Sequence, residues 1–164
     1  MLGLSLSAFT ALHVIVSLIA IVAGIIVMFG LLGSKHLPIL SAVFLLLTIL
    51  TSATGFLFPF AMLLPSHMVG ILSLVLLAIA CIALYGMNLS GVWRPIYVVT
   101  AMTSLYLNVF VLVVQAFLKV PSLNALAPTQ SEAPFAAIQG VVLLLFVAAI
   151  IRGWRRFRPV PSFA

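Results

Sequence analysis

Two stretches of the chain, residues 1–34 and residues 37–93, carry no Lys, Arg, Asp or Glu. A single helix over the second stretch would be roughly 85 Å long, whereas the hydrocarbon core of a bilayer is about 30 Å thick. The second stretch must therefore turn back within its own length. Pro59 and Pro65 mark that turn, because proline lacks the backbone N–H that the interior of a helix needs.

The composition indicates a chain that lies mostly in lipid. Hydrophobic residues make up 66% of the 164 residues and charged residues make up 5%. Soluble globular proteins contain about 45–50% hydrophobic and about 25% charged residues. These figures exclude a soluble globular domain, a disordered chain and a disulfide scaffold, and they leave a small multi-pass membrane protein.

Charges, prolines and turn residues divide the chain into five transmembrane helices of one all-α helical bundle, a single domain over residues 1–164. Each crossing needs about 20 mostly apolar residues. The first run is expected to be a retained helix and not a signal peptide, because its first positive charge, Lys35, follows the apolar stretch. The predicted spans are residues 8–32, 38–58, 66–86, 96–118 and 135–152, with a polar loop over residues 121–134.

The basic residues are distributed unevenly between the two faces of this bundle. One face receives only Lys119, and the other receives Lys35, Arg94, Arg152, Arg155, Arg156 and Arg158. Cytoplasmic loops of membrane proteins carry the excess of Lys and Arg. We therefore expect the N-terminus outside and the C-terminus in the cytoplasm.

A polar stripe runs along the fourth predicted span. Its members fall within an arc of about 80° on a helix, so they should face the bundle interior. Asn108 lies near mid-membrane and Gln115 about one turn from the outer end. The stripe either bonds helices together, at roughly 0.6–2 kcal/mol per bond, or lines a cavity for a polar ligand, a water file or a quinone head group. It consists of Tyr97, Thr100, Ser104, Asn108 and Gln115.

Small residues on the first two spans predict close helix packing, since helices associate in lipid through small side chains and interhelical hydrogen bonds. The first span offers Ala20 and Gly24, four residues apart. The second offers Thr48, Thr51, Ser52 and Gly55.

Two histidines from different helices are predicted at the outer face. His13 lies a little over one turn inside the first span, and His67 begins the third. Such a pair is suited to a b-type haem or a copper ion, or to positioning a quinone for proton-coupled chemistry. Alternatively, each imidazole donates to a nearby carbonyl and has no further role.

The scarcity of charged residues disfavours several classes of function. No predicted span contains a charged residue, which disfavours a proton pump or an ion-coupled transporter. Glu132 is the only acid, so neither a carboxylate pair nor a Ser-His-Asp triad can form. These absences favour a non-enzymatic role without deciding it.

Aromatic and basic residues gather at the cytoplasmic face. They are expected to anchor the protein in the membrane interface and also fit anionic lipid head groups. Nucleic acid is not an expected partner, since these residues are held at the membrane surface. The set consists of Trp93, Arg94, Arg152, Trp154, Arg155, Arg156 and Arg158.

Four segments of the chain are similar to a known group of proteins. They are TILTSATGFLFP at 48–59, LPSHMVGI at 64–71, NVFVLVVQAF at 108–117 and LAPTQSE at 126–132. Together they resemble a group of small uncharacterised bacterial multi-pass inner-membrane proteins. The resemblance implies a location in the bacterial inner membrane and implies no chemistry.

The leading hypothesis is a non-enzymatic accessory subunit or small-ligand binder, for a quinone- or lipid-like ligand. Its polar cavity would open to the outer face, walled by Asn108 and Gln115 with His13 and His67 nearby. The alternative is an electron-transfer protein with haem b between His13 and His67, and a third class is a small transporter or channel. The expected partners are the lipid bilayer and either a membrane protein or a second copy of the chain.

Overall fold

The computed structural model describes residue 3, residues 5–58 and residues 65–158, and every regular element in these ranges is a helix. Five of the helices are long and apolar enough to cross a membrane. The predicted all-helical architecture, with five helices of membrane-spanning length, is confirmed. The elements are α1 Leu6–Leu32, α2 Pro38–Gly55, α3 Pro65–Cys81, the π-helix η1 Ile82–Gly86, α4 Trp93–Lys119, α5 Pro121–Leu126 and α6 Ala133–Arg156.

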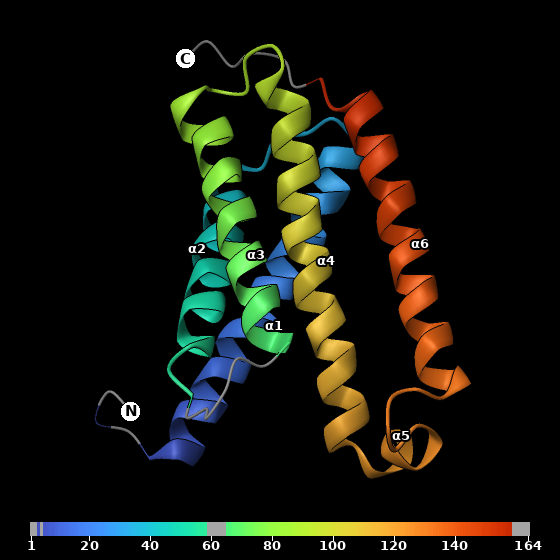
Figure 1. The fold of residues 1–164 in the computed structure, drawn as a ribbon. Coiled ribbons are helices and arrows are strands. Elements are labelled where there is room, and N and C mark those ends of the chain that lie inside the picture. Colours follow the sequence, from blue (N-terminus) through green and yellow to red (C-terminus); the bar gives the residue numbers. More distant parts are fainter. Residues whose placement is uncertain (1–2, 4, 59–64, 159–164) are drawn as a thin grey trace.

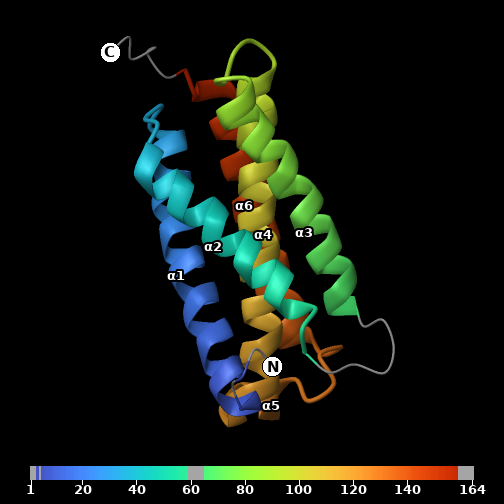
Figure 2. The same cartoon turned by 90° about the vertical axis from the view of Figure 1, so that its left-hand side faces the viewer.

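Helix α4 lies at the centre of the bundle and packs against α1, α2, α3 and α6. Helix α2 crosses diagonally between α1 and α3 (Figure 2). Helix α1 begins at one end of the bundle and α6 ends at the other (Figure 1). We call the end that carries Lys35, Arg94 and Arg152–Arg158 the arginine end, and the other the opposite end.

Local chemistry accounts for the helix starts. The hydroxyl of Ser5 accepts a hydrogen bond from Ala8 N, which satisfies one free N–H of α1 and extends that helix to Leu6. Proline occupies the first turn of α2 and of α6, where its missing N–H costs nothing. Pro121 likewise begins α5, a short helix in the segment that the sequence predicted as a loop.

Two helix ends differ from the predicted boundaries. Helix α2 ends at Gly55, three residues early, because the N–H groups of Phe56 and Leu57 bond carbonyls only three residues back and tighten the chain into a turn. The predicted turn between the second and third spans falls largely on residues 59–64, outside the described residues. Helix α6 continues to Arg156, where basic side chains favourably face the negative end of the helix dipole.

Gly24 lies in a close contact between α1 and its neighbours. A Cβ atom at this position would lie 2.5 Å from Leu105 Cδ1 on α4 and 2.8 Å from the Phe44 ring on α2. Ala20, one turn earlier, is completely buried. These two positions form the packing surface that the small residues of the first span predicted.

Substituting Gly24 by Ala should therefore destabilise the bundle, by about 1–3 kcal/mol for an overpacked core. The matched control is Gly140→Ala, also within a spanning helix, where an added Cβ meets nothing within 4 Å. Unfolding in detergent, followed by circular dichroism, measures both variants. Equal midpoints for the two variants would contradict the close packing at Gly24.

Candidate functional site at His13

Hydroxyl side chains on α2 make side-chain hydrogen bonds to three other helices. They lie on the faces of α2 that meet α1, α3 and α4. The pairs are Thr54 with His13 and Thr51 with Ser17 on α1, Ser52 with Ser73 on α3, and Thr48 with Asn108 on α4. Helix α2 therefore bonds three other helices through its hydroxyl side chains. Thr54, in its last turn, bonds His13 of α1.

The contact between His13 and Thr54 determines which imidazole nitrogen carries the proton. His13 Nδ1 lies 2.9 Å from Thr54 Oγ1. Thr54 Oγ1 in turn donates its only proton to the carbonyl of Leu50, at 2.6 Å. When the Thr54 hydroxyl donates to Leu50 O, its oxygen accepts from His13, and Nδ1 then carries the imidazole proton. A neutral His13 then presents Nε2 as a bare acceptor.

Aromatic rings surround this imidazole on one side. The ring of Phe58 meets His13 edge to face, with centroids 5.2 Å apart and planes at 88°. Phe58 also contacts Phe9, whose ring is buried, at 5.1 Å. These contacts limit rotation of the imidazole, so the orientation that Thr54 imposes is kept.

A pocket of about 160 Å³ lies beside His13, between α1 and α2. Its walls are almost entirely apolar, and two of its lining residues, Leu12 and Leu50, are 50% and 43% exposed on the outer surface of the bundle. The pocket therefore opens sideways, toward lipid. Its lining consists of Phe9, Leu12, His13, Val16, Leu50 and Thr54.

The structure places His67 apart from this pocket. His67 is buried and packs against the ring of Phe56, with centroids 5.6 Å apart. His67 is on α3, and α2 lies between α3 and the His13 helix (Figure 2). His67 does not line the pocket at His13, and no cluster of three or more metal-ligating side chains occurs in the described ranges.

Asn108 and Gln115 also lie away from the His13 pocket. Asn108 is half-buried, and its Nδ2 lies 3.5 Å from Thr48 Oγ1, as expected for a bond between helices. Gln115 is exposed, so the prediction that the whole stripe faces inward is wrong at this residue. At that end α4 packs on α5 and the following loop, where Gln130 Nε2 donates to Val114 O at 2.8 Å.

The other residues of the stripe, Tyr97, Thr100 and Ser104, are buried. The hydroxyls of Thr100 and Ser104 donate to carbonyls of their own helix, at 2.8 and 2.9 Å. Tyr97 and Ser41 are completely buried, and their hydroxyls face each other without meeting hydrogen-bond geometry. These buried residues of the stripe thus fit a role in helix packing better than a role in a ligand site.

The residues predicted to lie at the membrane interface all belong to the arginine end, at the start of α4 and at or just beyond the end of α6. Trp93 and Arg94 begin α4 and are half-buried, and Trp93 packs against the core. The remaining members are exposed: Arg152, Trp154, Arg155, Arg156 and Arg158. In the turn before α2, burial lowers the pKa of His36, which favours a neutral imidazole there.

Glu132, the only acid, is held in the loop before α6. Desolvation disfavours its ionised form, but hydrogen bonds from the Thr129 hydroxyl and from the backbone N–H groups of Thr129 and Ser131 outweigh that effect and lower the pKa. The stabilisation from these bonds is present above the usual carboxyl pKa and is lost as the pH falls through the lowered value. Glu132 therefore serves the loop's own structure.

Sequence reasoning missed the partners of His13. Neither the polar stripe nor the small-residue pattern points to Thr54, Phe9 or Phe58. The available signal was that Thr54 and His13 lie at the same end of two antiparallel neighbours. A comparison of the chain with models of known families, with curated proteins and with solved structures finds no match. The resemblance to small bacterial inner-membrane proteins stays a prediction.

The protonation of His13 is directly testable. Nitrogen-15 NMR of histidine-labelled protein in detergent should show His13 as the Nδ1–H tautomer at a pH where it is neutral. Thr54→Val removes the acceptor and should shift the population toward Nε2–H, whereas Thr54→Ser should retain Nδ1–H. A His13 spectrum that is the same in the Val variant and the wild type would contradict the role of Thr54.

Proposed function

We propose that this multi-pass membrane protein binds the polar head of a small lipid-like molecule at His13. The observation that carries the proposal is an imidazole that bonds Thr54 through Nδ1 and lines an apolar pocket between α1 and α2. The protein would act as a non-enzymatic ligand-binding component or accessory subunit. This keeps the leading hypothesis from the sequence but assigns the site to α1 and α2 in place of a cavity along α4.

The chemistry of the pocket restricts the ligand. Nε2 can only accept a hydrogen bond in this tautomer, so the ligand must donate one, as a hydroxyl of a hydroquinone, a phenol or a lipid alcohol does. Pockets that enclose a drug-sized molecule measure about 300–1,000 Å³. A pocket of about 160 Å³ therefore admits only a head group. The tail of the ligand would remain among the lipid chains.

The haem hypothesis receives less support from the geometry. Axial ligation of one haem needs both imidazoles directed at the same iron. His13 and His67 have different aromatic neighbours, and only His13 lines the small pocket. Haem ligation by His13 and His67 stays a prediction, as does a transport function.

The proposal is tested with decyl-hydroquinone and its dimethyl ether as the probe pair. The two share a ring and a tail, but the ether has no proton to donate. Isothermal titration calorimetry on the purified protein in nanodiscs should show saturable binding of the hydroquinone and at least about tenfold weaker binding of the ether, the equivalent of one hydrogen bond of roughly 1.5 kcal/mol.

His13→Phe should abolish that difference, because it replaces the acceptor by a ring that still fills the space. His36→Gln, at the arginine end, is the matched histidine control and should leave the difference unchanged. Equal binding of the two probes by the wild type would overturn the proposed site. A redox-sensitive haem band in the purified protein that both His13→Ala and His67→Ala remove would instead support the electron-transfer alternative.

We also propose that the arginine end faces the cytoplasm, with the protein in a bacterial inner membrane. Its support is the accumulation of basic residues at one end of a five-span bundle. Single cysteines in a Cys81→Ala background test the orientation in spheroplasts. Ala125→Cys on α5 should react with a membrane-impermeant maleimide, whereas Ser90→Cys at the arginine end should react only after permeabilisation. The reverse pattern would overturn the orientation.

A further inference from the structure

We propose that the outward face of α6 at the arginine end binds an anionic phospholipid. The lipid phosphate would contact the guanidinium groups of Arg152 and Arg156, and Arg155 on the other side of the helix would add positive charge nearby. One acyl chain would lie along Leu144, Ala148 and Ile151. This inference rests on α6 alone and is independent of the proposed ligand at His13.

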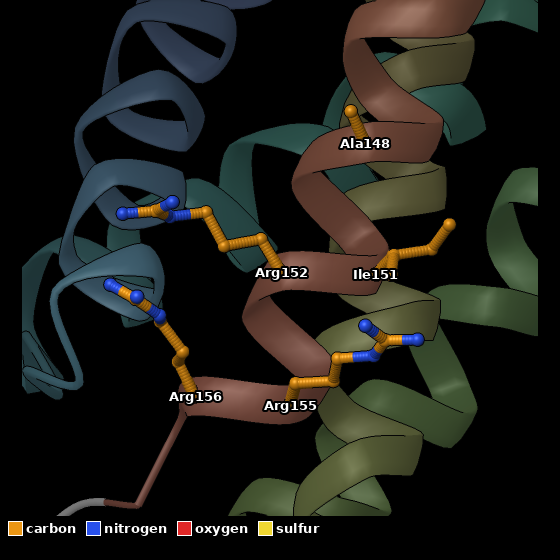
Figure 3. A pocket seen from close by; sticks show the side chains of 5 residues that line it. All are labelled: Ala148, Ile151, Arg152, Arg155 and Arg156. Carbon is orange, nitrogen blue, oxygen red and sulfur yellow. The ribbon is translucent and has the colours of Figure 1, made fainter.

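A shallow pocket of about 460 Å³ lies on this face of α6, lined almost entirely by apolar atoms, which include the aliphatic stems of the arginines. Arg152 and Arg156 extend to one side of α6 and Arg155 to the other, with Ala148 exposed on the helix surface one turn above Arg152 (Figure 3). Guanidinium groups bind phosphate oxygens in pairs, which makes arginine well suited to recognise a phosphate. The pocket lining consists of Ala148, Ile151, Arg152, Arg155 and Arg156.

The apolar part of the site continues along the same helix toward mid-membrane. Only 6% of the most apolar stretch of α6 is buried in the bundle, whereas the other four spans bury 28% to 39%. Leu144, one turn before Ala148, is 69% exposed, and Val141, one turn further, is 58% exposed. The helix thus presents a continuous apolar surface that leads to three guanidinium groups, which matches the chain and head of a phospholipid.

No acidic side chain lies near these arginines in the described part of the chain. Glu132 is the only acid in the chain, and it lies just before the start of α6, twenty residues before Arg152. At 1.5 Å per residue that separation is roughly 30 Å, well beyond direct contact. The counter-ion must come from outside the protein, and an anionic phospholipid brings the charge together with an apolar chain.

A second copy of the chain does not satisfy the same site. Two copies inserted in the same orientation would place arginine ends together, and the acid of each would lie at the other face. Such a contact would oppose like charges without compensation. Charge complementarity therefore favours a lipid over a dimer on this surface.

Fluorescence quenching in vesicles tests the proposal. Both native tryptophans are replaced by Phe, and Leu144→Trp is introduced beside the expected acyl chain. Val75→Trp on the lipid-exposed surface of α3 is the matched reporter elsewhere. Each reporter is reconstituted in vesicles of phosphatidylcholine with brominated phosphatidylglycerol or brominated phosphatidylcholine. The ratio of the two quenching constants measures preference for the anionic lipid.

At Leu144→Trp we expect the anionic lipid to be preferred by at least about fivefold, because each basic residue near a membrane surface contributes roughly that factor. The preference should fall to near unity with Arg152, Arg155 and Arg156 all changed to Gln. Arg158→Gln, which removes an exposed charge outside the pocket, should retain it. Val75→Trp should show no preference.

Four outcomes would overturn the proposal. Equal quenching by both lipids at Leu144→Trp would leave the arginines as interface anchors only. Quenching by neither lipid would show that a protein surface covers α6. A preference that survives the triple substitution would reflect general surface charge. Loss of the preference on adding inorganic phosphate, but not chloride at equal ionic strength, would assign the site to a free anion.

Discussion

The close approach of α1 to α2 and α4 around Gly24 is the contact on which the candidate site depends. Lipid provides no hydrophobic gain for burying one leucine against another, so helices in a bilayer associate through close packing and hydrogen bonds. The hydrogen bond between Ser17 and Thr51 and that between His13 and Thr54 lie further along the same antiparallel pair. The register that close packing sets at one end of α1 thus brings an imidazole to a hydroxyl at the other.

The polar residues of the interior divide into two groups with different consequences. Thr100 and Ser104 are buried, and their hydroxyls donate to carbonyls of their own helix. Thr54 also bonds its own helix, but its remaining lone pair accepts from His13 and so orients the imidazole. The hydroxyl of Thr54 therefore makes His13 a candidate ligand-binding group.

The basic and acidic side chains of the last helix and its preceding loop lie far apart. The arginines of the last helix lie about the length of a span from the only carboxylate, which is engaged with its own loop. In a bundle whose long helices are mostly apolar, this imbalance gives one end of α6 a distinct chemistry. The proposed sites for a neutral head group and for an anionic one thus lie toward opposite ends of the bundle, on different helices.

The sequence by itself determined the all-helical class, the number of spanning helices and the gathering of basic residues at one end. Long uncharged runs predict helices, because a helix satisfies its own backbone hydrogen bonds in lipid. The order of the spans then assigns each loop, with its charges, to one end of the bundle. Helical periodicity also placed Thr100 and Ser104 inside. It misplaced Gln115, because exposure there depends on how α5 and its loop pack against α4. Only the tertiary structure decided that His13 meets Thr54 while His67 meets Phe56. That pairing depends on the diagonal course of α2 between α1 and α3, which is set by side-chain packing among distant segments.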